Sequence, residues 1–465
     1  MGTSASAADP RGDTIAAVAT AAGRAALAVV RLSGPSARAI AARLGVPADI
    51  EPRRATRARL HLPDRPAEPL DEAVVTVHVA PRSFTGEDTV EFSVHGGMFV
   101  SRALLVALVE AGARPARAGE FSERAVLHGK LDLLQAEAIA DLIDARSAAM
   151  HRAALRQLGG ALSHRIGALR EALLDVEALI AYEIDFPEED DGPLPRARAL
   201  VAAERAGAGI DALLATLPQS ELARDGLVVV IAGAPNVGKS SLFNTLAGDA
   251  RAIVSEIPGT TRDALEVLVD DEPLPIRFVD TAGLRASTDA VERLGVEVSL
   301  RRLASAHAVL VCADDDAALE GACVVVAAHS AAPRIAVRTK VDLLAHASVW
   351  RTPVPLLAEY TVAVSAATGA GLPALRAAVR AIARAHAPEP AEEHPVVTRA
   401  RHVRALTAAR AEIALFVEAW SVGTLPAPVA GTHLRAAVLA LDELVGGIDA
   451  DEVLGRVFRT FCVGK

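Results

Sequence analysis

Residues 233–240, GAPNVGKS, have the composition and spacing of a loop that binds nucleotide phosphates. The glycines let successive backbone N–H groups turn toward phosphate oxygens. Lys239 can reach the terminal phosphates, and the Ser240 hydroxyl can ligate Mg²⁺. The aliphatic run 227–231 predicts a buried parallel strand, and a helix beginning near Ser240 would direct its positive end at the same anion. A chance glycine turn between a strand and a helix is the alternative, and the rest of the chain decides between them.

Two further motifs supply groups for Mg²⁺ and the γ-phosphate. Residues 259–263, GTTRD, place a threonine hydroxyl where it can complete the Mg²⁺ shell. Residues 280–283, DTAG, follow a predicted strand at 276–279. The Asp280 carboxylate can hold the Mg²⁺ water shell, and the Gly283 N–H can contact the γ-phosphate.

Two more motifs are suited to a guanine base. Residues 339–342, TKVD, follow a predicted strand at 335–337, and Asp342 can accept both N–H groups that guanine, unlike adenine, presents together. Residues 365–367, SAA, can present backbone groups to the base edge. All five motifs occur in the order expected of a GTPase, which favours GTP over ATP. The guanine motif usually begins with Asn, so Thr339 is expected to affect affinity more than specificity.

The residue after the DTAG motif is Leu284, where Ras-type GTPases have a water-orienting glutamine. Leucine cannot hydrogen-bond water, so hydrolysis is either very slow or served by another residue. Glu292 is a candidate because it follows in a short loop. From the sequence alone it is equally an ordinary solvated glutamate at a helix start.

Length and composition limit the possible classes of protein. The 465 residues are too many for one core and predict about three domains. No apolar run reaches a membrane span, and residues 1–13 carry no apolar signal core, so a cytoplasmic protein without membrane contact is expected. The three cysteines, Cys312, Cys323 and Cys462, have no CxxC spacing, which argues against a disulfide framework or a zinc site. A net charge of −10 argues against tight autonomous binding to nucleic acid.

Hydrophobic periodicity predicts an α/β and α multidomain protein. Residues 1–130 read as an α/β unit with strands near 14–20, 25–32, 74–79 and 90–94, and with Ser36 as a helix N-cap. Residues 131–224 and 387–465 read as helical, the latter with helices near 399–420, 433–444 and 449–461. The nucleotide-binding domain, 225–386, lies between them, which suggests one discontinuous helical domain with the nucleotide domain inserted.

The whole chain resembles the MnmE (TrmE) family of tRNA-modification GTPases. The resemblance is carried by stretches spread from end to end: DTIAAVATAAGR with VVRLSG, SFTGEDTVEFSVHGG, GEFSERAVLHGKLDLLQAEAIADLIDA, YEIDFPEED, GAPNVGKSSLFN, IPGTTRD, DTAGLR with VERLGVE, and the terminal FCVGK. The terminal signatures are far more specific than the GTPase motifs, because other GTPases lack them.

The resemblance implies a folate-binding N-terminal α/β domain that also dimerises, a discontinuous helical domain, and an inserted Ras-like P-loop GTPase domain. It implies a homodimer that works with the FAD-dependent partner MnmG as a heterotetramer. Together they would add an aminomethyl or carboxymethylaminomethyl group to C5 of the wobble uridine of certain tRNAs. A one-carbon tetrahydrofolate would supply the methylene carbon. Hydrolysis of GTP would be stimulated by K⁺ and coupled to association of the G domains.

Matching positions imply roles for individual residues. The folate contacts would be Arg31, Glu91, Lys130 and Lys465. Mg²⁺ would be held by Ser240 and Thr261, and K⁺ by Asn236, Ser255, Ile257 and Thr260. Glu292 would orient the attacking water, Lys239 would act on the phosphates, and the Cys462 thiol would serve the modification near the folate. The full GTP-contacting set would be Asn236, Val237, Gly238, Lys239, Ser240, Ser241, Ser255, Glu256, Ile257, Pro258, Gly259, Thr260, Thr261, Asp280, Thr281, Ala282, Gly283, Thr339, Lys340, Asp342, Ser365, Ala366 and Ala367.

Two stretches depart from the family pattern. Residues 21–26 read AAGRAA where the family usually has PPGRGG, and residues 313–332 are unlike typical members. Two other functions fit the sequence less well. A ribosome-assembly GTPase of the Era/Der kind would carry a KH-type module or a second G domain, neither of which is evident. A folate protein with an incidental G domain would not need the intact hydrolysis motifs.

Overall fold

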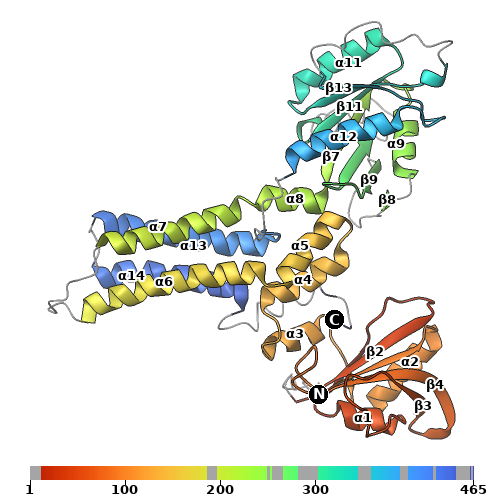
Figure 1. Ribbon diagram of the computed structural model, residues 1–465, viewed down its shortest axis with the longest axis vertical. Coiled ribbons are helices and arrows are strands. Elements are labelled where there is room, and N and C mark those ends of the chain that lie inside the picture. The colour runs from red at the N-terminus through yellow and green to blue at the C-terminus, as the bar shows by residue number, and fades with distance from the viewer. Residues whose placement is uncertain are drawn as a thin grey trace, which may run out of the picture. The chain divides into compact units, whose positions relative to one another are not determined.

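The computed structural model describes residues 12–185, 196–248, 252–253, 265–280, 302–343, 358–387, 396–422, 426–446, 461 and 464. The chain divides into two compact units. The first comprises Met1–Ala140, Leu158–Gly207 and Arg404–Lys465, and the second comprises Asp141–Gln157 and Ala208–Val403. Figure 1 shows the elements of each unit.

The first unit contains a six-stranded sheet with the order β3-β4-β5-β2-β1-β6. Its pairs are antiparallel except that β1 and β6 run parallel. The strands are β1 (Ile15–Val18), β2 (Leu27–Ser33), β3 (Thr56–Leu62), β4 (Arg65–His78), β5 (Thr89–His95) and β6 (Arg114–Pro115).

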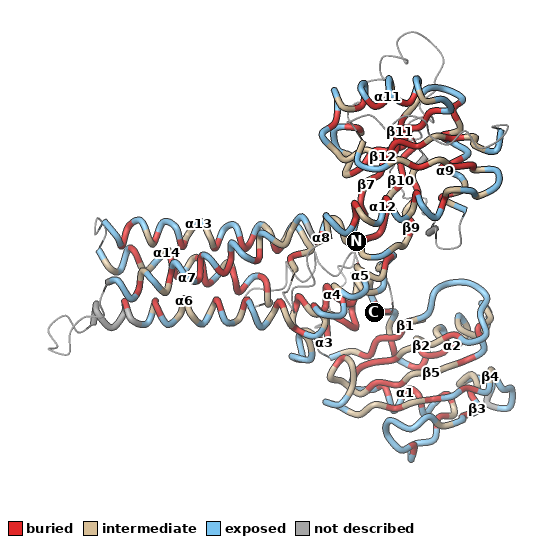
Figure 2. The backbone as a smooth tube through the Cα atoms, turned by 45° about the horizontal axis from the view of Figure 1, so that its top comes forward, coloured by how far each residue is buried: buried red, intermediate tan, exposed pale blue. Residues whose placement is uncertain are grey.

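Alternation along the strands separates two faces of this sheet. Val30 and Leu32 of β2 and Val90 and Phe92 of β5 are buried in one core with helices α1 (Ala37–Arg43) and α2 (Met98–Glu110). The intervening residues, which include Arg31, point to the other face. Figure 2 shows this alternation of buried and less buried positions.

The four predicted strands are present as β1, β2, the end of β4, and β5. The hairpin formed by β3 and most of β4 was not predicted. Buried and exposed side chains do alternate along β3, because Ala58 and Leu60 are buried while Arg57 and Arg59 are exposed. The arginines and prolines of this hairpin make the pattern hard to see in the sequence. Ser36 occupies the N-cap position of α1 without a capping side-chain bond. Its backbone N–H donates to Thr14 Oγ1 at 3.0 Å instead.

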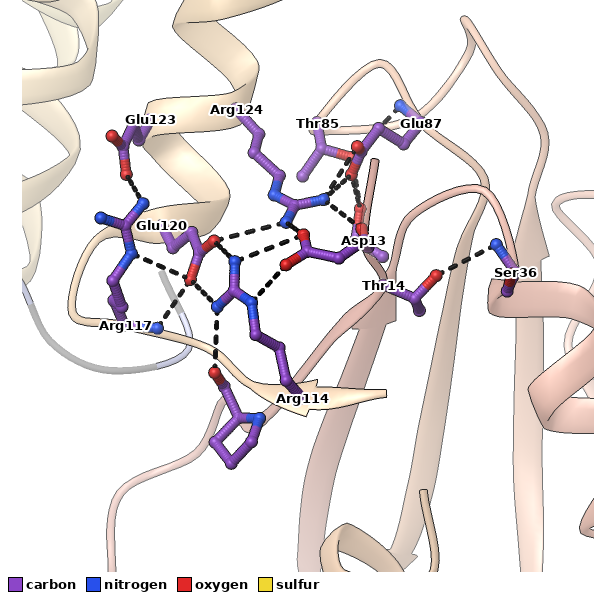
Figure 3. A network of polar contacts seen from close by, with 12 residues as sticks. Asp13, Thr14, Ser36, Thr85, Glu87, Arg114, Arg117, Glu120, Glu123 and Arg124 are labelled. Carbon is purple, nitrogen blue, oxygen red and sulfur yellow. Dashed lines mark hydrogen bonds and ion pairs between the residues drawn. The ribbon is translucent and has the colours of Figure 1, made fainter. Parts of the chain in front are cut away.

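A buried ionic network joins the start of β1 to helix α3 (Glu120–Leu127). Arg124 is 1% exposed, and its Nη1 donates to Glu87 Oε1 at 2.9 Å and to the Asp13 carbonyl at 2.8 Å. Its Nη2 pairs with the carboxylates of Asp13 and Glu120. Arg114 of β6 also pairs with Asp13 and Glu120. Figure 3 shows these side chains converging from four separate segments.

Helices flanking the nucleotide domain in sequence pack together within the first unit. Long helices α6 and α14 are joined by ion pairs between Arg170 and Asp442 and between Arg435 and Glu177. Gly207 of α7 lies against Arg410 of α13, where an added Cβ would be 3.5 Å from the guanidinium. Among the residues that the structure describes, the helices outside the nucleotide domain and beyond α3 are α4 (Leu133–Asp144), α5 (Ala148–Leu158), α6 (Ala161–Asp185), α7 (Arg196–Leu214), α8 (Leu217–Asp225), α13 (Ala400–Val422) and α14 (Ala427–Val445).

Helix α14 begins six residues before the predicted start at 433. Pro426 at the N-cap and Pro428 in the first turn are compatible with this start, because the N–H groups there have no partner within the helix. Of the helix predicted at 449–461, only Phe461 is among the described residues. Phe461 packs on Leu133 of α4.

The second unit contains a seven-stranded sheet with the order β13-β12-β11-β7-β10-β9-β8. Helices α9 and α12 pack on one face and α11 packs on the other. In Figure 2 the central strands between these layers are buried. The described elements are β7 (Leu227–Gly233), α9 (Lys239–Gly248), β8 (Ala252–Ile253), β9 (Leu265–Val269), β10 (Ile276–Asp280), β11 (Ala308–Ala313), α11 (Asp316–His329), β12 (Arg334–Arg338), η2 (Val341–Leu343), β13 (Tyr360–Ala363) and α12 (Leu372–His386).

Strands β9 and β10 form a hairpin whose turn carries three consecutive acidic residues, 270–272. Each of the three contacts a different partner. Asp270 Oδ1 accepts the backbone N–H of Ala148, the first residue of α5, at 3.2 Å. Glu272 lies 3.6 Å from Arg152 of α5. Asp271 accepts from Arg380 of α12 at 2.8 Å. Helix α5 and the G-domain sheet therefore belong to one compact unit.

Among the described helices, none is both long enough and apolar enough to cross a membrane.

The network around Glu120 predicts acid sensitivity of the N-terminal sheet. Burial alone would raise the pKa of Glu120, but hydrogen bonds from Arg114 and from the Arg117 backbone outweigh it and lower the pKa to about 2. Because this pKa is lower in the folded state, the stabilisation is complete above pH 4.5 and is lost as the pH falls toward 2. We expect Glu120→Gln to remove up to about 3 kcal/mol at pH 7 and less at pH 3.

Urea unfolding at pH 7, 4.5 and 3, followed by hydrogen exchange in peptides from β1 and α3, measures this difference. Glu51→Gln is the control, because its ion pair with Arg54 is largely exposed. An equal loss in Glu120→Gln at every pH would contradict the expected linkage.

Candidate functional site

The loop between β7 and α9 has the backbone shape of an anion-binding nest. Gly233, Asn236 and Gly238 have positive φ angles of 144°, 65° and 98°. Only glycine fits at 233, because a Cβ there would lie 2.1 Å from the carbonyl oxygen of Cys312 on neighbouring β11. Asparagine tolerates the left-handed conformation better than most residues. The loop thus directs its N–H groups inward, at the N-terminus of α9.

Lys239, Ser240 and Asp280 meet at this loop. Lys239 is 7% exposed and its Nζ donates to the Ala234 carbonyl at 2.7 Å, so its side chain spans the loop. Ser240 Oγ donates to Asp280 Oδ2 at 2.9 Å, and Asp280 is fully buried. A hydroxyl and a carboxylate facing each other are hard oxygen donors, which fit Mg²⁺.

The sheet brings the predicted motifs to one edge. Strands β7, β10, β11, β12 and β13 are parallel, so their carboxyl ends lie on the same side. The phosphate loop follows β7, Asp280 ends β10, Thr339 follows β12, and Ser365 follows β13. Open parallel sheets bind ligands at this edge.

Thr339 links the base motif to the phosphate loop. Its hydroxyl donates to the carbonyl of Val237 and lies 3.1 Å from that of Ala313, and the residue is 4% exposed. The backbone N–H of Thr339 donates to the Ala313 carbonyl at 2.8 Å. A threonine at this position therefore still ties the two loops together.

The remaining base-motif residues lie beside this link. Lys340 has a positive φ of 56°, and its Nζ pairs with Asp314 Oδ2 at 2.9 Å. The hydrogen bond from Lys340 lowers the pKa of the Asp314 carboxyl. Asp342 is exposed in η2, with its carboxylate accessible to a base. The Ala366 carbonyl lies 3.3 Å from Thr245 Oγ1 of α9, which places residues 365–367 near the phosphate helix.

A second candidate site surrounds Arg31 on the N-terminal sheet. Arg31 Nη2 pairs with Glu91 Oε1 at 2.7 Å across the β2–β5 pair. The guanidinium carbon is 5.6 Å from the ring centroids of both Phe84 and Phe121. Both distances are within the range of cation–π attraction. The structure thus brings two of the predicted folate contacts, Arg31 and Glu91, into direct contact.

Lys130 and the C-terminus belong to the same unit. Lys130 Nζ donates to the Pro81 carbonyl at 3.1 Å, in the loop that carries Phe84. Gly464 is buried where an added Cβ would lie 2.6 Å from the Val18 carbonyl, at the end of β1. Residue 464 therefore packs against the strand that pairs with the strand of Arg31.

Several predicted site residues lie outside the described residues, so their predictions remain untested. They are Ser255, Glu256, Ile257, Pro258, Gly259, Thr260, Thr261, Thr281, Ala282, Gly283, Glu292, Cys462 and Lys465.

Comparison with known proteins covers the chain from end to end. Residues 14–130 match the family model described as GTP-binding protein TrmE N-terminus, and residues 133–462 match the MnmE helical domain. The tRNA modification GTPase MnmE of Azoarcus sp. (strain BH72) is 42% identical over 456 residues, which are 97% of this chain and 98% of that protein. The chain belongs to the MnmE family.

Other MnmE proteins show the same coverage. That of Neisseria meningitidis serogroup C (strain 053442) is 42% identical over 97% of this chain and 99% of its own length. That of Laribacter hongkongensis is 39% identical over the same shares. Among solved structures, the G domain of the T. maritima FeoB iron transporter is 24% identical and covers 34% of this chain and 98% of that chain, with a TM-score of 0.28.

Three contact residues of this MnmE family member were missed in the sequence. Phe84 and Phe121 lie within the family stretches SFTGED and GEFSER, yet only the charged residues were singled out there. Aromatic residues make up 3% of the chain, so two of them in these stretches were a usable signal. Asp314, the partner of Lys340, has no local signal, because it lies 26 residues away in sequence.

The Thr339 link predicts a measurable effect on nucleotide affinity. Thr339→Val keeps the shape but removes the donor to a buried carbonyl, so the Kd for GTP and GDP should rise about 5- to 30-fold. Preference for GTP over ATP should not change, because Asp342 is untouched. Thr339→Asn, which restores a side-chain donor, is the matched control. Fluorescent-nucleotide titration measures all three, and a wild-type Kd in Thr339→Val would show that the link is dispensable.

Proposed function

We propose that this protein hydrolyses GTP to support addition of an aminomethyl or carboxymethylaminomethyl group to C5 of the wobble uridine of certain tRNAs. It acts with the FAD-dependent partner MnmG and takes the methylene carbon from a one-carbon tetrahydrofolate. The supporting observation is the presence of two candidate sites on one chain, the phosphate loop and the Arg31 cluster, in a protein that matches MnmE relatives over 97% of its length.

The nucleotide site has the groups that phosphoryl transfer requires. The inward-facing loop and Lys239 bind the phosphates of GTP. Ser240 and Thr261 would hold Mg²⁺, and Asp280 would hold the water shell of the ion, which would neutralise charge on the phosphates. Asp342 accepts from guanine, while the Thr339–Val237 hydrogen bond keeps the base motif and the phosphate loop in register.

Two further groups complete the hydrolytic machinery in this proposal. Leu284 cannot orient water, so Glu292 takes that role. Asn236, Ser255, Ile257 and Thr260 would hold K⁺, which would supply the positive charge that an arginine finger gives other GTPases. Asn236 lies within the phosphate loop, where its backbone is left-handed.

The Arg31 cluster has the chemistry of a folate site. Folates carry carboxylates at one end and a ring with N–H donors at the other, so they require both cations and an acceptor. Arg31, Lys130 and Lys465 supply the cations, and Glu91 supplies the acceptor. Packing of residue 464 against β1 supports a role of the C-terminal segment, including Cys462, at this site.

A homodimer through the N-terminal domains is part of the proposal. One sheet face is packed under α1 and α2, while the other face carries half-buried or exposed side chains such as Val29, Val74 and Ser93. Val74 is 46% exposed, although valine is among the residue types that proteins most often bury. A second copy covering this face would bury these positions.

A segment that has no acidic residues supports contact of this protein with tRNA. Residues 145–170 contain no Asp or Glu, although the whole protein has a net charge of −10. They contain five arginines and two histidines: Arg146, His151, Arg152, Arg156, His164, Arg165 and Arg170. Because Arg152 and Arg170 already pair with Glu272 and Asp442, the phosphate neutralisation that RNA binding needs would come from the other basic residues of this segment.

The proposed function is tested by mass analysis of tRNA nucleosides from cells that lack this gene. We expect loss of the aminomethyl-type modifications at the wobble uridine, restored by the wild-type gene and not by a Lys239→Ala gene. Full retention of these nucleosides, in cells without a redundant gene, would contradict the proposal.

Activation by K⁺ is tested with the full-length protein. Exchange of Na⁺ for K⁺ should raise GTP turnover at least about tenfold, because a fixed cation at the transferring phosphate stabilises the transition state. Asn236→Ala should abolish the rise while the low turnover in Na⁺ persists. Turnover in the wild-type protein that is indifferent to the cation would refute the K⁺ assignment.

A further inference from the structure

The two aromatic rings beside Arg31 come from segments that are distant in sequence. Phe84 lies in the loop between β4 and β5, and Phe121 lies in the first turn of α3. Both rings lie 5.6 Å from the Arg31 guanidinium, so its orientation depends on how the loop and the helix are held together.

The buried ionic network joins these two segments. Thr85 and Glu87 follow Phe84 in the loop, and Glu120 directly precedes Phe121. Arg124, one turn further along α3, reaches both oxygens of Glu87 at 2.9 and 3.1 Å. Figure 3 shows Arg124 between the carboxylates of Glu87 and Asp13.

The same network reaches the strand that carries Arg31. Ser33 Oγ donates to Glu87 Oε2 at 2.8 Å and lies 2.7 Å from Thr85 Oγ1. Ser33 is two residues from Arg31, so both side chains point to the same face of the sheet. Glu87 thus joins helix α3, its own loop and β2 through one carboxylate.

Stability alone does not explain this arrangement. The guanidinium of Arg124 is 1% exposed and Glu120 is 1% exposed, and buried charge pairs often contribute no more stability than apolar residues of the same size. Their distinguishing property is geometric, because one guanidinium that donates to Glu87 through Nη1 and to Asp13 and Glu120 through Nη2 fixes the relative positions of the segments that carry them.

We propose that the Arg124–Glu87 pair, supported by Asp13 and Glu120, is a positioning device for the candidate folate site. It holds Phe84 and Phe121 where they orient the Arg31 guanidinium toward a reduced folate. This inference rests on the proposed folate function. Glu87 and Arg124 are positioning residues that act on the folate through Arg31.

Isothermal titration of the full-length protein with tetrahydrofolate under reducing conditions tests the proposal. Glu87→Gln keeps the size of the side chain and replaces the charged acceptor with an amide. Arg124→Lys keeps the charge and loses the fork. Each should weaken folate binding at least about tenfold. GTP turnover, which belongs to the other compact unit, should remain at the wild-type rate and serves as the internal control.

A destabilised control separates positioning from general loss of structure. Leu104 is fully buried in α2, in the core under the opposite face of the sheet. Leu104→Ala should lower the melting temperature of the N-terminal unit at least as much as Glu87→Gln does. At about 15 °C below its own melting temperature, its Kd for tetrahydrofolate should nevertheless stay within about twofold of the wild-type value. Equal loss of folate binding in both variants would overturn the positioning role.

A double-mutant cycle tests the route through Arg31. Glu87→Gln is combined with Arg31→Lys, which keeps the charge but loses the planar group beside the rings. If Glu87 acts through Arg31, the double variant binds folate no more weakly than Arg31→Lys alone. Additive losses would show that Glu87 acts elsewhere.

The results of these titrations separate failure of the folate site from failure of the positioning role. If the wild-type protein does not bind tetrahydrofolate, the folate part of the proposed function fails. If the wild-type protein binds and Arg31→Lys weakens binding, while Glu87→Gln and Arg124→Lys bind as wild type, the folate site stands and the positioning role fails.

Discussion

A positively charged side chain inside this protein must be paired with hydrogen-bond acceptors where it lies, and this requirement shapes both candidate sites. Arg124 is buried among three carboxylates, and Arg31 is held by Glu91 and two aromatic rings. Lys239 folds back onto a carbonyl of its own loop. An unpaired buried cation would be strongly destabilising. Each cation therefore fixes the segments that supply its partners, and the sites derive their rigidity from this pairing.

The nucleotide site was largely predictable from the sequence, and the reasons are local. Residues 233–240 form a contiguous motif, and the aliphatic runs before each later motif mark the parallel strands. Because such strands end at one edge, the motifs had to meet there. The Thr339 hydroxyl contact with Val237 was not predictable, because it joins residues 102 positions apart and depends on the packing of two loops.

The N-terminal site was much less predictable from the sequence than the nucleotide site. Arg31 and Glu91 were identified only through the family resemblance, and their contact follows from the register between β2 and β5. The network that supports them links Asp13 to Arg124 across 111 residues. Hydrophobic periodicity cannot predict an ion pair between residues that lie so far apart in the sequence. The β3–β4 hairpin was missed for a different reason, because Arg57 and Arg59 occupy its exposed face and hide a regular alternation.

The acidic tip of the β9–β10 hairpin constrains how the G domain can deform. At the other end, β9 follows the segment that contains Thr261, and β10 terminates in Asp280 beside the phosphate loop. Strand β10 pairs with β9 on one side and with β7 on the other, so these strands cannot shift along their length without breaking backbone hydrogen bonds. A shift of these strands that begins beside the phosphates would therefore also strain the contacts that Asp270 and Glu272 make with α5 and that Asp271 makes with Arg380.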